Sequence, residues 1–268
     1  MLLTAVEDAL SLKALIQELE EAIADLEQYA YSQFDEMFGD SFSYMSDYFI
    51  SDSAYKPRAC IKVITEEGVA PLVRRPEPFA FIEGLSAAPS ENSAFDDIMG
   101  EPITHYMCND IPKQLSLGHY KNNRVDMDLF REMLKQYPEG HMPDEDWKKC
   151  WKKVHLIVEN REEVLPPLEP PIEMCYRSTL VVPMSLVTKE LSEDFIDQFE
   201  ISADAGTAVF GFLCFDHPEA GFFEAEDIDF GYVLADLLSL YIIQQLMYTD
   251  YSSVYRTAQL AVAKYASA

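Results

Sequence analysis

Thr207-Ala-Val-Phe-Gly-Phe-Leu-Cys-Phe215 is the stretch of this 268-residue chain that decides its fold. The run is almost entirely apolar, which is typical of a central strand covered on both faces of its sheet. A second strand is predicted at Ser178-Thr-Leu-Val-Val-Pro-Met184, and a turn at 216–221 leads from the first strand into a helix. Two apolar strands with a following helix predict a domain of the α+β class.

Further strands are predicted upstream. Cys60-Ile-Lys-Val-Ile-Thr65 is rich in β-branched residues and precedes Glu66-Glu67-Gly68, a turn of hairpin type. The segment 69–73 is the second arm, and Pro71 within it indicates an edge strand or a strand end, because proline cannot donate to a neighbour. Two shorter apolar runs, at 79–82 and 104–108, are further strand candidates.

Residues 84–170 form an irregular insertion with helical apolar spacing at 125–137 and 144–158. In the second of these helices, Trp147, Cys150 and Trp151 fall on one arc and four lysines on the other. The lysines are Lys148, Lys149, Lys152 and Lys153. They are either a solvated face that balances the acidic surface or a docking patch for an acidic partner. A proline-rich spacer at 165–171 leads back into the sheet.

Long helices are predicted at both ends of the chain, because apolar residues recur three and four apart from Leu2 to Ala30 and again from Phe230 to Tyr265. The first is either an amphipathic helix on its own domain or a parallel dimer seam. We expect a homodimer held by a bundle of these helices. The predicted divisions are a coiled-coil-like helix at 1–45, a domain at 46–245 and a helical extension at 246–268.

Charge excludes several classes of partner. The chain has 20 Lys+Arg against 47 Asp+Glu, a net charge of −27. Nucleic-acid binding depends on cations that neutralise phosphates, so we expect no direct nucleic-acid binding. An anionic membrane surface would also repel the chain. No export signal and no membrane span are recognised, and five scattered cysteines suit reduced thiols, so we expect a cytoplasmic protein.

Three segments of the last third resemble a GAF domain, the PAS-like sensory module. They are Tyr176–Met184, a strand with Val-Pro; Val209–Asp216, a strand with Gly-x-Leu; and Gly221–Ile228, which holds Phe-x-x-Glu-Asp. The resemblance is strongest over 176–245 and reaches back to about 60. It implies an antiparallel sheet with flanking helices and a ligand cavity between the sheet and the insertion. Glu224 stands where a Ser or Thr helix cap would be expected.

Asp110-Ile111-Pro112 is similar to the Asp-Ile-Pro element beside the chromophore in phytochrome GAF domains. No Cys-His pair follows, since Cys150 precedes Trp151 and Cys175 precedes Tyr176, so we expect no bilin and leave the cofactor unknown. The element either lines a ligand cavity or is a strand end terminated by proline.

The resemblance implies a ligand site with polar contacts from Asp110, Tyr120 and Arg177 and apolar walls from Tyr106 and Phe212. The alternative is structural: Asp110 caps a loop and Arg177 balances a carboxylate. No GxGxxG, GxxxxGK[ST], GxSxG or HExxH motif occurs, and no histidine has metal-ligand spacing, so no catalytic or metal-binding residues are predicted.

The leading hypothesis is a non-enzymatic sensor that binds a small molecule and signals through its terminal helices to a separate output protein. A second hypothesis is an acidic interaction module with an empty GAF-like fold, mimicking nucleic acid toward a basic partner. A third is a thiol enzyme centred on Cys108, although no positive charge adjoins this thiol in the sequence.

Overall fold

A computed structural model describes residues 55–65, 68–75, 87–100, 104–137, 142–151, 175–191 and 206–243, with scattered positions at 17–49, 193 and 196. The side chains of 73–75 are outside this description. The chain divides into two compact units. Met45–Asp236 is one, and Met1–Tyr44 with Leu237–Ala268 is the other. The divisions that we expected at 45 and 245 stay predictions.

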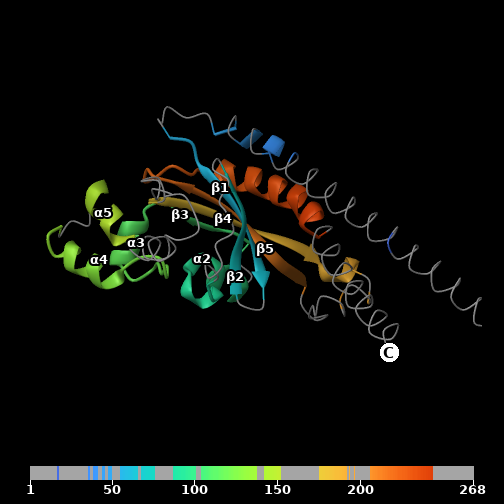
Figure 1. Ribbon diagram of the computed structural model, residues 1–268, viewed down its shortest axis with the longest axis horizontal. Coiled ribbons are helices and arrows are strands. Elements are labelled where there is room, and N and C mark those ends of the chain that lie inside the picture. Colours follow the sequence, from blue (N-terminus) through green and yellow to red (C-terminus); the bar gives the residue numbers. More distant parts are fainter. Residues whose placement is uncertain are drawn as a thin grey trace, which may run out of the picture. The chain divides into compact units, whose positions relative to one another are not determined.

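The Met45–Asp236 unit is built on a five-stranded antiparallel sheet (Figure 1). The strands are β1 (Arg58–Thr65), β2 (Gly68–Arg75), β3 (Tyr106–Cys108), β4 (Ser178–Val187) and β5 (Thr207–His217). Their order is β2-β1-β5-β4-β3, so the apolar β5 occupies the centre, as predicted. The α+β class and the antiparallel sheet are therefore confirmed. The apolar run at 79–82 lies outside the described residues.

The hairpin of β1 and β2 forms one edge of the sheet. Gly68 has φ +118°, and a Cβ there would lie 2.5 Å from the Ala87 carbonyl oxygen, so only glycine fits this turn. Pro71 is opposite Lys62, and the register shifts between Ile61 and Lys62. The prediction of an edge strand from the proline is confirmed.

A helix at 225–236 covers one face of the sheet (Figure 1, orange-red). A Cβ at Gly231 would lie 2.7 Å from Val182 and 3.7 Å from Phe215, which shows how closely the helix packs. Glu224 precedes the helix as predicted, and its backbone N–H donates to the Asp227 carboxylate at 2.7 Å. Asp227 thus supplies the reverse half of a capping box, in which a side chain three residues into the helix accepts from the backbone N–H of the cap residue.

Helix α2 (Ser93–Gly100) covers the opposite face, where Phe95 lies 4.7 Å from Phe212 between ring centroids. Phe212, Cys214 and Asp216 alternate along β5 and are opposite Lys62, Cys60 and Arg58 of β1. Because side chains alternate along a strand, these six residues share one face of the sheet. We call it the α2 face. The short 3₁₀ helix η1 (Pro89–Glu91) leads into α2, and η3 (Thr188–Glu190) follows β4.

The insertion contributes three short helices, α3 (Ile111–Ser116), α4 (Met127–Leu134) and α5 (Asp144–Cys150). They pack around a buried cluster of Cys108, Ile111, Leu115, Tyr120, Val125, Phe130, Met142, Trp147, Cys150 and Trp151. The apolar arc predicted for α5 is confirmed, but the predicted continuation from Cys150 to 158 is wrong at its start. Trp151 has ψ 58°, which is not helical, and 152–158 lie outside the described residues.

The predicted helices at 1–45 and 246–268 lie almost entirely outside the described residues, as does the spacer at 165–171. The helical bundle and the homodimer therefore stay predictions. Over the parts of the chain that are described, no helix combines the length and apolarity needed to cross a membrane.

Candidate functional site

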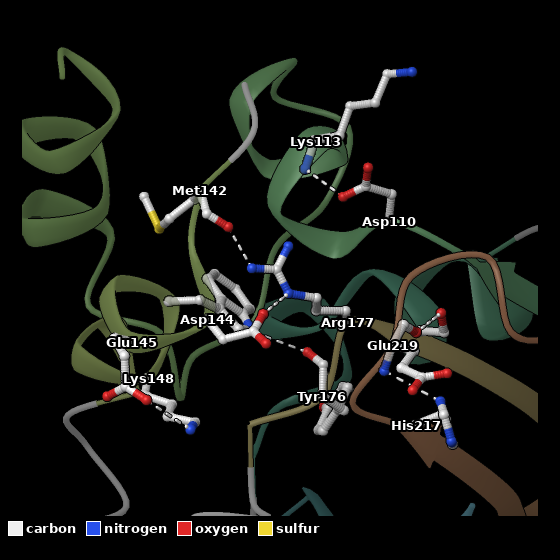
Figure 2. Close-up of polar contacts among 12 residues, drawn as sticks. Asp110, Lys113, Met142, Asp144, Glu145, Lys148, Tyr176, Arg177, His217 and Glu219 are labelled. Carbon is white, nitrogen blue, oxygen red and sulfur yellow. Dashed lines mark hydrogen bonds and ion pairs between the residues drawn. The ribbon is translucent and has the colours of Figure 1, made fainter. Parts of the chain in front are cut away.

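Arg177 lies at the start of β4 and is buried. Its Nε is 2.9 Å from Oδ1 of Asp144, the first residue of α5, and its Nη2 donates to the Met142 carbonyl oxygen (Figure 2). The guanidinium therefore joins the sheet to the segment that begins α5.

The backbone of Arg177 makes two further connections. Its N–H donates to the His217 carbonyl at 2.8 Å, and its carbonyl accepts from the Ile111 N–H at 2.8 Å. One residue thus connects β4, β5, α3 and α5. This geometry is the structural alternative that we considered for Arg177, a cation that balances a carboxylate. Its role as a ligand contact stays a prediction.

Asp110 is the N-cap of α3. Its Oδ1 accepts from the Lys113 backbone N–H at 3.1 Å (Figure 2), and Pro112 occupies the first turn. Asp110-Ile111-Pro112 is therefore the start of a helix and not a strand end terminated by proline, and its place beside a ligand cavity stays a prediction. Whether Asp110 also contacts a ligand stays a prediction.

Asn109 is a positioning residue that the sequence did not reveal. Its amide oxygen accepts from the Phe223 N–H at 3.1 Å and its amide nitrogen donates to the Phe223 carbonyl at 2.6 Å. Its own carbonyl accepts from the Gly221 N–H at 2.7 Å. Asn109 therefore fixes the chain before α3 to the turn that precedes the helix at 225–236.

His217 ends β5 with both ring nitrogens engaged. The Glu219 backbone N–H donates to Nδ1 at 3.1 Å (Figure 2), so Nδ1 carries no proton. Nε2–H donates to the Tyr55 carbonyl at 3.0 Å. Phe222 stacks on the ring at a centroid distance of 3.5 Å. Burial lowers the pKa of His217. The residue is thus a neutral structural histidine.

Tyr120 belongs to a buried polar network. The Asn122 amide nitrogen donates to the Tyr120 hydroxyl at 3.3 Å and to the Tyr176 hydroxyl at 3.2 Å. Burial raises the pKa of Tyr120 well above its usual value, so its phenol keeps its proton. In this network the Tyr120 hydroxyl is an acceptor, and its own proton is directed to no acceptor among the described residues.

Trp151 adds a second buried donor to this network. Its ring lies 4.9 Å from the Tyr176 ring, and its side chain is almost fully buried. The indole Nε1–H has no acceptor among the described residues. Buried donors in native proteins are nearly always paired. The Trp151 indole is thus a buried donor without a partner among the described residues, next to Tyr176.

Tyr106 and Phe212 both contribute to the α2 face. Phe212 is fully buried with Cys60, Cys214 and Phe95 in one apolar cluster, and Tyr106 packs against this cluster and against the cluster around the insertion helices. Tyr106 lies 6.3 Å from Tyr120 between ring centroids. The structure therefore brings together Tyr106, Tyr120 and Phe212, whereas Asp110 caps α3 and Arg177 is joined to the start of α5.

Cys108 is a buried thiol. Burial raises its pKa to about 11, so it is protonated at neutral pH. Because the thiolate is the nucleophile, this environment disfavours thiol chemistry at Cys108. No group of three or more His, Cys, Asp or Glu residues that could hold a metal ion occurs within the described ranges.

Two of the four lysines that we singled out are described. Lys148 lies 3.2 Å from Glu145 and Lys149 lies 2.5 Å from Asp146, each three residues earlier on α5 (Figure 2 shows the first pair). This is the arrangement expected of a solvated face in local charge balance. Lys152 and Lys153 are outside the described residues.

The sequence did not point to Lys62 or Arg124 as functional residues. Lys62 belongs to the α2 face, and its Nζ lies 4.7 Å from the centroid of the Phe95 ring. An alternating strand pattern identifies such a position as half-buried but does not single out its charge.

No protein-family model matches this chain and no curated protein matches it, so its membership of the GAF family stays a prediction that rests on the residues quoted above.

Proposed function

We propose that this protein is a sensory module of the PAS-like GAF type that binds a small molecule on the α2 face. An antiparallel sheet in the order β2-β1-β5-β4-β3 supports a PAS-like fold. A helix on one face and the insertion on the other also agree with that fold (Figure 1). The sheet order is independent of the sequence motifs that first suggested the family.

The observation that carries the proposal is the unpaired indole N–H of Trp151 beside Tyr176. The buried Trp151 indole N–H has no acceptor among the described residues, and the buried Tyr120 hydroxyl accepts from the Asn122 amide in the same network. An unpaired buried donor costs about 1–3 kcal/mol. A bound molecule with an acceptor atom would remove that cost, and the surrounding aromatic rings would cover its apolar part.

Strand β5 offers a route for the signal. Phe212 points to the α2 face, and Phe215, which lies on the other face, packs close to Gly231. A ligand that favours one position of β5 would thereby favour one position of the helix at 225–236. Such a population shift requires different affinity for the two arrangements. We propose that a separate output protein reads this difference.

Native mass spectrometry of gently purified protein tests the proposal. We expect a small-molecule adduct that dissociates when the ions are collisionally activated. Tyr120→Phe should weaken the retention of this adduct about tenfold, because one hydrogen bond between uncharged groups is lost. Tyr137→Phe is the matched control, since its hydroxyl donates to Asp146 instead. An adduct retained equally by both variants would place the ligand elsewhere on the chain.

A second function is supported by a different observation. The polar groups of Arg177 and Asp110 are used within the protein, which suits an acidic interaction module without a ligand. An adduct-free mass spectrum, together with a melting temperature that no metabolite raises, would favour this second function over the sensor.

A further inference from the structure

Lys62 is a half-buried cation on the α2 face with no carboxylate at ion-pair distance among the described residues. Its ammonium lies over the Phe95 ring, a weak electrostatic partner compared with a carboxylate. Asp216 shares this face, and its carboxylate accepts from the Thr179 hydroxyl at 2.8 Å. Lys62 therefore carries a partly desolvated charge without a formal counter-ion.

Arg124 brings a second cation to the same place. Asn122, two residues earlier, bridges to Asn92 at the start of α2, and its amide oxygen accepts from the Arg124 backbone N–H at 3.0 Å. The Arg124 side chain is half-buried and makes no hydrogen bond or ion pair with the described residues. Burial lowers the pKa of Lys62, and the positive charge of Arg124 lowers it further.

Several other cations among the described residues have anionic partners. Lys121, three residues before Arg124, lies 2.5 Å from Asp96 of α2. Further pairs are Arg131–Asp128, Lys135–Glu132, Lys148–Glu145, Lys149–Asp146 and Arg177–Asp144. In a chain of net charge −27, carboxylates are abundant. Two neighbouring cations that lack one are thus an unusual arrangement, and it becomes favourable when an anion binds between them.

We infer that the ligand of the proposed sensor is an anion, a carboxylate or a phosphate, held by Lys62 and Arg124. Arg124 would offer its planar fork to two oxygens of the anion, and Lys62 would add a point charge. Phe95 would contact the apolar part of the ligand. This inference rests on the proposed function, which does not itself specify the ligand's charge.

The test measures the melting temperature with inorganic phosphate, acetate, benzoate and the uncharged benzamide at millimolar concentrations. We expect phosphate or benzoate to raise it in the wild type, as binding to the folded state requires. Lys62→Met and Arg124→Gln should each weaken the response about tenfold, the loss expected of one charge-assisted hydrogen bond. Lys121→Gln, which removes an equal but paired charge from the same loop, should keep it.

The outcomes separate this inference from the proposed function. A response to benzamide equal to that of benzoate would overturn the anion and leave the sensor in place. Equal responses to an anion in all four proteins, or no response to any anion, would also overturn it. Comparing the response to phosphate with the responses to acetate and benzoate shows whether the site prefers a phosphate or a carboxylate. If Lys62→Met fails to fold, Arg124→Gln carries the comparison alone.

Discussion

His217 has no free ring nitrogen with which to accept a proton. Protonation would place a hydrogen on Nδ1 against the Glu219 N–H that now donates to it. The ring is buried against Phe222, so a charge there would also be poorly solvated. The contacts with the Glu219 N–H and the Phe222 ring therefore favour the neutral form of His217 in the folded state.

Stability should depend on pH through His217. Its pKa is lowered in the folded state, so below the unfolded-state pKa of about 6.5 the unfolded chain binds the extra proton and folding loses free energy. The contribution is complete above that pH and is lost as the pH falls through the folded-state pKa. Urea denaturation between neutral and acidic pH measures it.

His217→Asn is the control for this dependence. The variant is less stable at every pH because two hydrogen bonds change, but its stability should fall less steeply on acidification. Parallel pH curves for wild type and variant would show that the histidine does not contribute.

Arg177→Met should destabilise the ligand-free protein by about 2 kcal/mol. The substitution removes the ion pair with Asp144 and leaves the buried Met142 carbonyl without its donor, and the loss of a partner by a buried group is costly. Chemical denaturation with purified protein measures this loss.

Asp144→Asn is the matched variant for Arg177→Met. The Asp144 side chain is 74% exposed and asparagine keeps an accepting oxygen, so the expected loss is about 1 kcal/mol or less. Unchanged stability of Arg177→Met would argue against the structural role and return the residue to the list of ligand contacts.

At the scale of single residues, the sequence identified chemical types better than partners. Asp110 and Arg177 were recognised as polar residues of interest, but their partners were not. Lys113 and Asp144 lie in the first turns of two short helices, and these helices were difficult to place from the sequence. Lys62 was passed over because a lysine within an alternating strand is ordinary. Its lack of a carboxylate becomes visible only when the neighbouring elements are in place.

At the scale of elements, apolar strands were predicted well and short helices less well. β1, β2, β4 and β5 carry continuous β-branched or apolar runs, and Pro71 correctly marked the edge. α2 and α3 were missed because six to eight residues give too few turns for a helical period to stand out. α5 ends at Cys150 because Trp151 is not helical, although the apolar spacing of the sequence continues past it.

Gly211, the glycine of the Gly-x-Leu strand, is required by the close approach of β1. A Cβ at this position would lie 2.6 Å from the Lys62 carbonyl oxygen, a backbone atom that cannot move without disturbing the central strand pair. Gly211→Ala should therefore cost about 2–4 kcal/mol of unfolding free energy. Thermal or chemical denaturation measures the loss.

Gly206→Ala is the control for the Gly211 substitution. No atom lies within 4 Å of a Cβ at Gly206, just before the same strand, so its stability should stay close to that of the wild type. Similar losses at both positions would show that backbone entropy and not steric contact decides the effect.

At the scale of the whole molecule, the predicted homodimer has a specific surface to test. Leu237 and Leu240 are three apart on one stripe of the helical segment at 237–243 and are 55% and 59% exposed. Such a stripe is typical of a helix that meets another helix. We expect Leu237→Asp with Leu240→Asp to convert a dimer to a monomer in sedimentation equilibrium, because unpaired charges would be buried in the seam.

Leu117→Asp is the control for the dimer variant. Leu117 is likewise an exposed leucine, but it follows α3 and belongs to no heptad pattern. It should leave the mass unchanged. A monomeric wild type, or a mass that the double variant does not alter, would contradict the dimer.

The central position of β5 also determines the order in which the sheet can assemble. Lys62 is opposite Phe212, 150 positions later in the chain (212 − 62). During synthesis the β1–β2 hairpin emerges early, yet its inner edge has no partner until β5 leaves the ribosome. Pairings this distant in sequence slow folding, and an open apolar edge favours aggregation. A nascent chain of this protein therefore depends on chaperones or on rapid elongation until its last strand is made.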